Sequence, residues 1–349
     1  MQQVNSKKQT NRTLARSSTT GAQAGRLQSR LYEMLVCPRD KKELRIDGTH
    51  LVCPGGHRYA VIEGIPILLI SEAEQTHIEG ARALLIAESG DAASLPKFDV
   101  GAKEIDPFVR NAIGATNGSF YQHLVGNLSE YPIPRLRLPP GEDRLFLEVG
   151  CNWGRWCVAA ARLGYQPIGI DPSLKSIRAA IRVARQLGID AAYVVADSRF
   201  LPFRDQSVDQ VFSYSVLQHL SKENAGASLL EIRRALRSGG AALIQMPNVF
   251  GVRCLYHQIR RGFRECRDFE VRYWRPGELL AAFTRAIGPS ELSVDGYFSL
   301  NVQPSHLHLL PARYRALVRV SELLRWMSGK MPVLVRVADS LYINSRRVD

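Results

Sequence analysis

Apolar and polar residues follow two alternating patterns from residue 145 onward. Short apolar runs that end in Gly, Asp or Ser are typical of buried strands, and the segments after them place apolar residues three and four positions apart, as helices do. This order predicts strands at 145–149, 167–170, 191–196, 208–213 and 241–246, and helices at 155–164, 174–188 and 221–236. Strands that alternate with helices predict an α/β fold with a doubly wound parallel sheet, whose ligand site lies at the carboxyl ends of the strands.

The sequence after the fifth strand predicts the closing part of the same domain. A basic stretch at 253–275 precedes a helix at 276–287, a sixth strand at 291–297 and a seventh strand at 341–344, which returns antiparallel and closes the sheet. Residues 305–338 are then expected to form a helical insertion between the last two strands, beside the substrate face. We therefore assign residues 141–349 to one seven-stranded, Rossmann-like domain.

The first 140 residues show three different patterns. Residues 1–30 have no apolar period and are expected to be a disordered basic tail, with an organelle transit peptide as the alternative. Residues 31–72 contain short strand patterns around a turn at Gly64, which predict a small β module. Such a unit buries little core alone, so a metal or a partner surface is expected to support it. Residues 73–140 are interpreted as a helical linker and cap, with one helix from about 74 to 88.

Composition and charge exclude several classes of protein. The 349 residues are 45% hydrophobic and 23% charged, which is typical of a globular chain, and no run of 18 apolar residues predicts a membrane span. Six cysteines without the spacing of a small disulfide scaffold favour a reducing cytoplasm. The net charge of +13 divides into +6 in residues 1–30, zero in 31–249 and +7 in 250–349. The chain is therefore not uniformly basic, as a general nucleic-acid-binding protein would be.

Glycine and acidic residues follow the first three strands of this domain. Gly150 and Gly154 bracket the turn after the first strand, where a Cβ would take space that a ligand needs. Asp171 ends the second strand, 21 residues after Gly150, where a carboxylate can accept hydrogen bonds from two ribose hydroxyls. Asp197 ends the third strand and can accept a hydrogen bond from an adenine amine. The Gly-x-x-x-Gly spacing differs from that of a dinucleotide loop and favours a nucleoside ligand without phosphates.

The order of these motifs resembles class I S-adenosylmethionine-dependent methyltransferases, most of all their type 11 small-molecule branch. The matching segments are E-V-G-C-N-W-G at 148–154, G-I-D-P-S at 169–173, A-D-S-R-F-L-P-F at 196–203, D-Q-V-F-S-Y-S-V-L-Q-H-L at 209–220 and E-I-R-R-A-L-R-S-G-G at 231–240. Together they extend the resemblance over about residues 120–300. The resemblance implies a Rossmann-like methyltransferase fold.

The same resemblance implies a site for S-adenosylmethionine. Its cofactor-binding residues are expected to be Glu148, Gly150, Cys151, Asn152, Gly154, Asp171, Pro172, Asp197, Ser198 and Ser213. The methionine part would lie against Glu148 and Gly150, with Ser213 beside the sulfonium. Cys151 is expected to be an inert apolar residue rather than a nucleophile. His219, just after the fourth strand, is the candidate general base, with a structural role for this histidine as the alternative.

A second resemblance concerns the module at 31–72. Its two Cys-Pro pairs and its Cys-x-x-x-His spacing resemble the zinc-ribbon-like activator protein of tRNA and release-factor methyltransferases, and the N-terminal zinc module of some ribosomal-RNA methyltransferases. The resemblance implies a metal site with the ligands Cys37, Asp40, Cys53 and His57. Asp40 stands where a second cysteine is expected, so a zinc site and a metal-free relic both remain open. In either case the module is expected to dock on the catalytic domain rather than to react.

Three functions follow from these resemblances. The first is methyl transfer from S-adenosylmethionine to a small-molecule acceptor, such as a sugar or a lipid-linked intermediate, by in-line displacement in the cytoplasm. The second is an RNA or translation-associated methyltransferase that docks through the module, although no Asn-Pro-Pro-Tyr-type motif follows the fourth strand. The third is a non-catalytic binding subunit with a methyltransferase fold. The insertion at 305–338 interleaves Leu and Trp with Arg, which predicts peripheral contact with an anionic membrane, with a cap packed on the sheet as the alternative.

Overall fold

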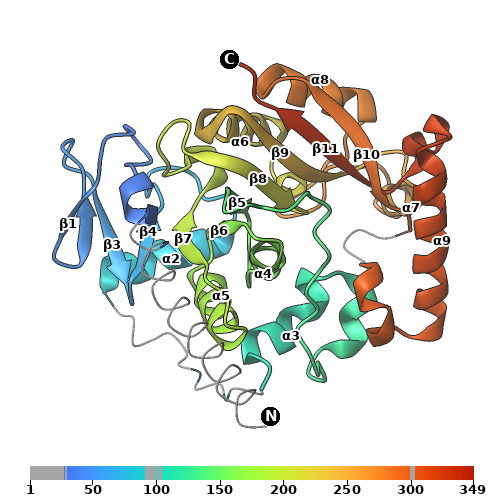
Figure 1. The fold of residues 1–349 in the computed structure, drawn as a ribbon, viewed down its shortest axis with the longest axis horizontal. Coiled ribbons are helices and arrows are strands. Elements are labelled where there is room, and N and C mark those ends of the chain that lie inside the picture. Colours follow the sequence, from blue (N-terminus) through green and yellow to red (C-terminus); the bar gives the residue numbers. More distant parts are fainter. Residues whose placement is uncertain (1–26, 28–29, 91–97, 99–100, 102–103, 299–302) are drawn as a thin grey trace, which may run out of the picture.

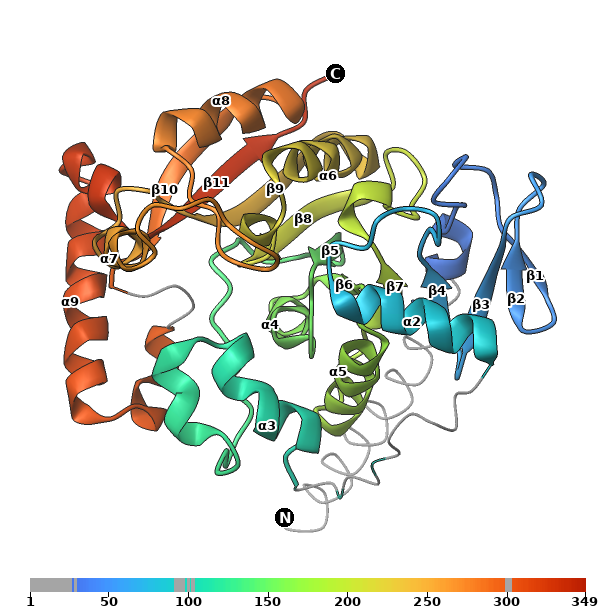
Figure 2. The same ribbon diagram turned by 180° about the vertical axis from the view of Figure 1, so that it is seen from behind.

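The structure is a computed structural model that describes residues 27, 30–90, 98, 101, 104–298 and 303–349. The expected disordered tail at 1–30 lies outside the described residues except for Leu27 and Arg30. Figure 1 shows a twisted central sheet with helices on both of its faces, and Figure 2 shows the same arrangement from behind. The α/β class expected from the alternating pattern is therefore present.

Seven strands from the second part of the chain form the centre of the sheet. Their order is β7-β6-β5-β8-β9-β11-β10, and β11 is antiparallel to both of its neighbours whereas the others in this series run parallel. The bounds are β5 Leu145–Val149, β6 Gln166–Asp171, β7 Ala192–Ala196, β8 Val208–Tyr214, β9 Leu236–Pro247, β10 Ser290–Gly296 and β11 Ser340–Arg346. Because the chain starts in the middle at β5 and moves outward in both directions, the carboxyl ends of β5, β6, β7 and β8 meet at one edge.

The helices between these strands form two layers. They are α4 Arg155–Arg162, α5 Leu174–Gln186, α6 Lys222–Ala235 and α8 Pro276–Ala286. Figure 1 shows α6 and α8 on one face of the sheet and α4 and α5 on the other. Ser173 and Ser221 begin α5 and α6 as N-caps, since each hydroxyl accepts a backbone N–H three residues later. These caps fix the residue at which each helix begins, next to the carboxyl end of the preceding strand.

The N-terminal module, residues 31–72, extends this sheet instead of standing apart from it. Its strands are β1 Arg45–Asp47, β2 His50–Val52, β3 Arg58–Ile62 and β4 Ile65–Leu68. They form an antiparallel series, and β4 then pairs parallel with β7, so the described residues contain one sheet of eleven strands. The sequence analysis expects the sheet to end after seven strands, and the structure differs because the module adds four more at the β7 edge. The apolar run of β4, buried at all four positions, has the pattern of an inner strand.

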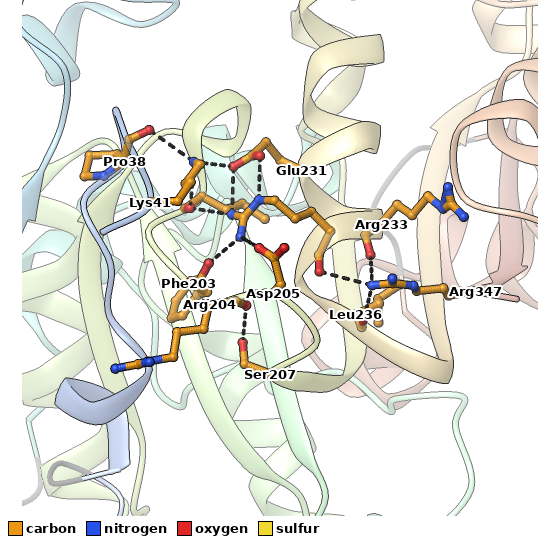
Figure 3. A network of polar contacts seen from close by, with 12 residues as sticks. Pro38, Lys41, Phe203, Arg204, Asp205, Ser207, Glu231, Arg233, Leu236 and Arg347 are labelled. Atoms are coloured by element: carbon orange, nitrogen blue, oxygen red, sulfur yellow. Dashed lines mark hydrogen bonds and ion pairs between the residues drawn. The ribbon is translucent and has the colours of Figure 1, made fainter. Parts of the chain in front are cut away.

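Contacts beyond the sheet also tie the N-terminal module to the part of the chain that follows residue 140. The backbone N–H of Val36 donates to Pro202 O at 2.9 Å, and that of Arg204 donates to Met34 O at 2.9 Å. Lys41 Nζ lies 2.8 Å from a carboxylate oxygen of Glu231 on α6, which Figure 3 shows together with the neighbouring arginine network. The module thus packs on residues 192–235 through backbone pairing and a partly buried ion pair.

Several shorter elements lie outside the strands and helices described so far. They are α2 Ile78–Ser89, α3 Pro107–Thr116, η2 Ser119–Leu124, η3 Ser198–Phe200, η4 Leu217–His219 and α7 Val252–Arg260. Between β10 and β11 the chain forms η5 Pro304–Leu309, α9 Ala312–Ser328 and η6 Pro332–Val337, where the sequence analysis expects a helical insertion. Phe120 of η2 stacks on Tyr314 of α9 with ring centroids 4.2 Å apart. The insertion therefore packs on the 107–124 segment, and Figures 1 and 2 both show α7 beside α9.

Candidate functional site

A cavity of about 420 Å³ opens at the carboxyl ends of β5, β6, β7 and β8. Its wall comes from the loops after these four strands, from the start of α2, from α3 and from Phe269. Of the expected cofactor residues it includes Glu148, Gly150, Cys151, Asn152, Asp171, Pro172, Asp197 and Ser198. We call this space the cofactor cavity, after the ligand that the sequence analysis expects there. The resemblance-based prediction and the cavity thus coincide at eight positions.

The loop after β5 depends on two glycines with positive φ. Gly150 has φ +77°, and a Cβ there would lie 2.3 Å from a methyl group of Val216. Gly154 has φ +78°, and a Cβ there would lie 2.7 Å from the hydroxyl oxygen of Tyr193. Both glycines are required because a Cβ would clash with other residues of the protein. The sequence analysis instead expects the clash to be with a ligand. Of the two, only Gly150 lines the cofactor cavity.

Asp171 ends β6 and fixes the loop that holds the glycines. Its two carboxylate oxygens accept backbone N–H groups from Asn152 and Ser173, each at 2.9 Å. Burial raises the pKa of Asp171 to about 6, and these two hydrogen bonds oppose that rise. Because a carboxylate has about four lone-pair sites, two of them remain for ligand hydroxyls.

Glu148 lies at the inner end of the cavity on β5. The side chain is 2% exposed, and its Oε2 accepts the backbone N–H of Cys157 at 2.7 Å. Burial raises the pKa of Glu148 to about 8, so the carboxyl is largely protonated in neutral solution in the absence of a ligand cation. A positively charged group that entered the cavity next to it would favour the ionised form.

Asp197 and Ser198 lie at the end of β7. Arg199 pairs with Asp197 at 2.7 Å, and the backbone N–H of Arg199 also donates to Asp197 Oδ1 at 2.8 Å. Ser198 Oγ lies 2.8 Å from Ser228 Oγ on α6. Asp197 therefore faces the cavity already held by a partner, which orients the carboxylate and leaves it less acceptor capacity than Asp171 has.

Ser213 lies elsewhere than the sequence analysis expects. Its side chain is fully buried, and its hydroxyl donates to Val149 O at 2.9 Å, which ties β8 to β5. The residues of this strand end that line the cavity are instead Tyr214, Ser215 and Val216. Side chains alternate between the two faces of a strand, and the pattern of β8 did not show which of its last residues faces the cavity.

His219 lines the cavity beside Phe269. The two rings stack with centroids 3.9 Å apart, and the Nδ1–H of the histidine donates to Phe269 O at 2.7 Å. Nε2 of His219 then accepts from the side-chain amide of Gln218 at 3.3 Å. Burial lowers the pKa of His219 to about 4, so the ring is neutral in neutral solution and Nε2 is its acceptor atom.

Sequence reasoning missed the part of the wall that comes from outside the strand loops. His77 caps α2 and makes an edge contact with Phe269 at 4.6 Å, and Glu79 pairs with Lys175 at 2.9 Å across the cavity edge. From α3 come the side chains of Phe108 and Thr116. These residues carry no motif, so only the packing of α2 and α3 over the strand ends could reveal them.

The Cys-Asp-His cluster consists of Cys37, Asp40, Cys53 and His57, and the structure brings all four together. Their ligand atoms lie within 4.8 Å of one another. His57 Nδ1 lies 3.4 Å from Cys37 Sγ, 3.3 Å from Cys53 Sγ and 3.6 Å from an oxygen of Asp40. A Cβ on Gly55 would lie 2.5 Å from Asp40 Oδ2, so a residue with a side chain at this position would clash with the carboxylate. Two sulfurs, one imidazole nitrogen and one carboxylate form a donor set that fits zinc.

Residues 146–240 match a protein family described as "Methyltransferase domain". A ubiquinone biosynthesis O-methyltransferase of Brucella ovis is 29% identical over 160 residues, which cover 42% of this chain and 60% of that enzyme. A probable fatty acid methyltransferase of Mycobacterium tuberculosis is 31% identical over 109 residues, which cover 31% of this chain and 25% of that protein. The chain thus matches only part of the length of these relatives.

Solved structures give more distant likenesses. A chain from the complex between the Haloferax volcanii Trm112 methyltransferase activator and a methyltransferase is 21% identical, with a TM-score of 0.43, and the match covers 61% of this chain and 86% of that one. A Methanosarcina mazei S-adenosylmethionine-dependent methyltransferase is 17% identical, with a TM-score of 0.44, over 63% of this chain and 99% of that one. Because both TM-scores are below 0.5, we infer nothing about this chain from these two structures. The family match over residues 146–240 and the named relatives show that this part of the chain is similar to methyltransferase domains.

Proposed function

We propose that the chain transfers a methyl group from S-adenosylmethionine to a small-molecule acceptor by in-line displacement. The observation that carries the proposal is the cofactor cavity, in which Glu148 and Asp171 end adjacent parallel strands and both face the same space. Asp171 keeps acceptor capacity for two ribose hydroxyls, and Glu148 offers a carboxyl group to the ammonium of the methionine part. Asp197 and Ser198 would border the adenine.

The chemistry needs little more from the protein than position. When bound, S-adenosylmethionine supplies a methyl group that is already activated by its positively charged sulfur. The chain then has to hold an acceptor in line with that methyl group and keep water out, since alignment contributes much of the rate. His77, His219 and Phe269 pack together at one side of the cavity, where they narrow its opening.

His219 is the residue that we propose as proton acceptor for a hydroxyl acceptor. Its Nδ1–H is fixed by Phe269 O, so Nε2 is the acceptor atom, and a substrate hydroxyl would have to replace the Gln218 amide as its hydrogen-bond donor. We expect His219→Gln to lower kcat by about tenfold or more with little change in the KM for the cofactor, because the cofactor residues stay in place. His257→Gln is the matched control, since His257 lies on α7 and does not line the cavity. An unchanged kcat in His219→Gln would contradict the role as proton acceptor and would mean that this histidine only packs against Phe269.

The acceptor class is tested by following labelled methyl groups. Purified protein is incubated with methyl-labelled S-adenosylmethionine and a cell extract, and the label is measured separately in organic-soluble small molecules and in RNA. The proposal predicts label in the small-molecule fraction that depends on Asp171. Label in RNA would support the RNA-directed alternative. Binding of the cofactor without any label transfer would support the non-catalytic alternative.

Zinc in the N-terminal module is part of the proposal. The Cys-Asp-His cluster offers four ligand atoms, and the docked module places them away from the cofactor cavity, in agreement with a structural role. A bound ion would satisfy the buried thiols and hold the turn at Gly55, so the module would keep the shape that pairs β4 with β7.

Peripheral contact with an anionic membrane is the remaining proposal about partners. On α7 the side chain of Tyr256 is 54% exposed and that of Ile259 is 58% exposed, and on neighbouring α9 Trp326 is 58% exposed. Residues 250–349 carry 16 basic and 9 acidic side chains, so this part of the chain has the charge that acidic lipid attracts. Among the described residues no helix is long and apolar enough to cross a membrane. The proposal keeps the cytoplasmic location that the sequence analysis expects.

Vesicle flotation tests the membrane contact. We expect wild-type protein to float with phosphatidylglycerol vesicles and not with phosphatidylcholine vesicles, and Ile259→Asp with Trp326→Asp to abolish flotation. Leu85→Asp is the control, because Leu85 is 64% exposed but lies on α2. Equal flotation with both lipids, or none with either, would contradict the proposal.

A further inference from the structure

Arg155 is a buried cation that has no anionic partner. It begins α4, is 6% exposed and lines the cofactor cavity. Its Nη1 has no hydrogen-bond partner, and no ion pair to Arg155 occurs in the part of the chain that the structure describes. The nearest aromatic rings are those of Trp156 and Tyr214, each with its centroid 5.8 Å from the guanidinium carbon. Two distant rings compensate only a small part of the cost of burying a charge.

Other buried arginines of this domain show how the fold normally handles such a charge. Arg178 is 8% exposed and lies 2.9 Å from a carboxylate oxygen of Glu63. Arg199 is 9% exposed and lies 2.7 Å from a carboxylate oxygen of Asp197. Arg155 is buried to the same extent but forms no ion pair, because Glu148 of the same cavity wall acts on its charge without a hydrogen bond or ion pair to it. A buried guanidinium stays protonated, so its missing anion has to come from the contents of the cavity.

Trp156 gives a second, independent sign of the same ligand chemistry. Its indole is 2% exposed and also lines the cofactor cavity, and its Nε1–H has no hydrogen-bond acceptor. The neighbouring Tyr214 differs, because its hydroxyl donates to Asp295 at 2.6 Å and is thus already used. Two consecutive residues therefore present unpaired donors in one wall. A buried donor without an acceptor destabilises the ligand-free protein, and a ligand oxygen that accepts from it would remove this cost.

We propose that Arg155 and Trp156 form an oxyanion subsite in the wall of the cofactor cavity, which takes a carboxylate or phosphate group of a bound ligand. The identity of that ligand rests on the proposed function. Under that function, the group belongs either to the amino-acid end of the cofactor or to an anionic acceptor. Both sources have the same chemistry, namely charged oxygens that accept from a guanidinium and an N–H group.

A pair of adenosyl compounds distinguishes the two sources. S-adenosylhomocysteine carries the amino-acid carboxylate, whereas 5′-methylthioadenosine has the same adenosyl thioether without it. If the cofactor supplies the anion, Arg155→Met weakens binding of S-adenosylhomocysteine by about tenfold or more and leaves that of 5′-methylthioadenosine unchanged in calorimetric titration. If the acceptor supplies it, both affinities stay the same. In that case, protein saturated with S-adenosylhomocysteine loses its binding of benzoate or inorganic phosphate in the variant.

The matched control is Arg162→Met, because Arg162 is an exposed arginine on the same helix and does not line this cavity. Thermal unfolding separates the subsite from a structural role. Loss of an unpaired buried charge should raise the Tm of ligand-free Arg155→Met, whereas loss of a structural arginine would lower it. Arg155→Lys provides a second variant, which keeps the charge without the planar fork and should show a smaller loss of affinity.

The proposal is overturned if none of the four ligands binds Arg155→Met differently from wild type. It is also overturned if Arg155→Met unfolds at a lower temperature and Arg155→Lys binds every ligand as wild type does. Failure of the proposed function gives a different result, since wild-type protein would then bind neither adenosyl compound. Binding of benzoate or phosphate, measured by tryptophan fluorescence, would still report on the subsite in that event.

Discussion

The cofactor cavity measures about 420 Å³, whereas the ligand atoms of the Cys-Asp-His cluster lie within 4.8 Å of one another. In the cavity, Asp171 and Glu148 are held from behind by backbone N–H groups and present their free lone pairs to open space. In the cluster, each polar atom faces the other three. The first arrangement suits a ligand of many atoms, and the second suits a single ion. The carboxylates of the cavity and the Asp40 carboxylate of the cluster thus suit different ligands, because their neighbours leave open space in the cavity and none in the cluster.

The largest expected effect is the loss of metal from the cluster. We expect wild-type protein to bind about one zinc ion per chain and Cys53→Ser to bind almost none, because one thiolate of the donor set is lost. Metal content after dialysis is measured by atomic emission. The control is Cys266→Ser, since Cys266 lies outside the cluster. Wild-type protein without zinc after purification and reconstitution would make the cluster a metal-free polar core.

A pH-dependent difference in stability should mark the cavity. The pKa of Glu148 is raised to about 8, so folded protein holds a proton that the unfolded chain releases near pH 4.5. The resulting stability is complete below about pH 4.5 and is lost as the pH rises to about 8. Relative to wild type, Glu148→Gln should therefore gain a few kcal/mol in free energy of unfolding over this range and no more above it. Urea unfolding at several pH values measures the difference, and a constant difference from pH 5 to 9 would contradict a buried, protonated Glu148.

A smaller effect is expected where the two regions join. Lys41 and Glu231 form a partly buried pair between the N-terminal module and α6, and Lys41→Met leaves the carboxylate with Arg234 alone (Figure 3). We expect a loss of about 1–3 kcal/mol in the free energy of unfolding. Arg58→Met removes an exposed pair with Asp47 within the module and should change stability little. Equal effects of the two substitutions would mean that the docking contact adds nothing to an ordinary surface pair.

The sequence predicted the regions where local pattern decides the structure. The central strands and the positions of Asp171 and Asp197 follow from periodicity and motif spacing. The pairing of β4 with β7 could not be predicted, because it joins residues 128 positions apart and depends on which sheet edge is open. Neither could the wall formed by Phe108 and Phe269, since long-range packing and not spacing places them.

Individual side chains were predicted less well than backbone positions. Ser213 was placed beside the cofactor, but its hydroxyl is used between β5 and β8. The partners of Arg155 were not considered, because only three-dimensional structure shows that a charged residue is buried without an ion pair. The orientation of a side chain at a strand or helix end is set by packing, which a motif does not contain.

Calorimetric titration with S-adenosylmethionine, comparing wild type with Asp171→Ala, tests the central claim most directly. Asp171 both fixes the loop at Asn152 and offers acceptor sites to ribose hydroxyls, so its loss should weaken binding by a hundredfold or more, on the order of 3 kcal/mol. The pKa of about 6 also predicts that wild-type affinity falls as the pH is lowered through 6, because protonation removes acceptor sites from Asp171. Saturable binding by wild type that is lost in the variant is the predicted result. Equal affinity in the two proteins, or no binding by wild type, would contradict the assignment of this cavity to the cofactor.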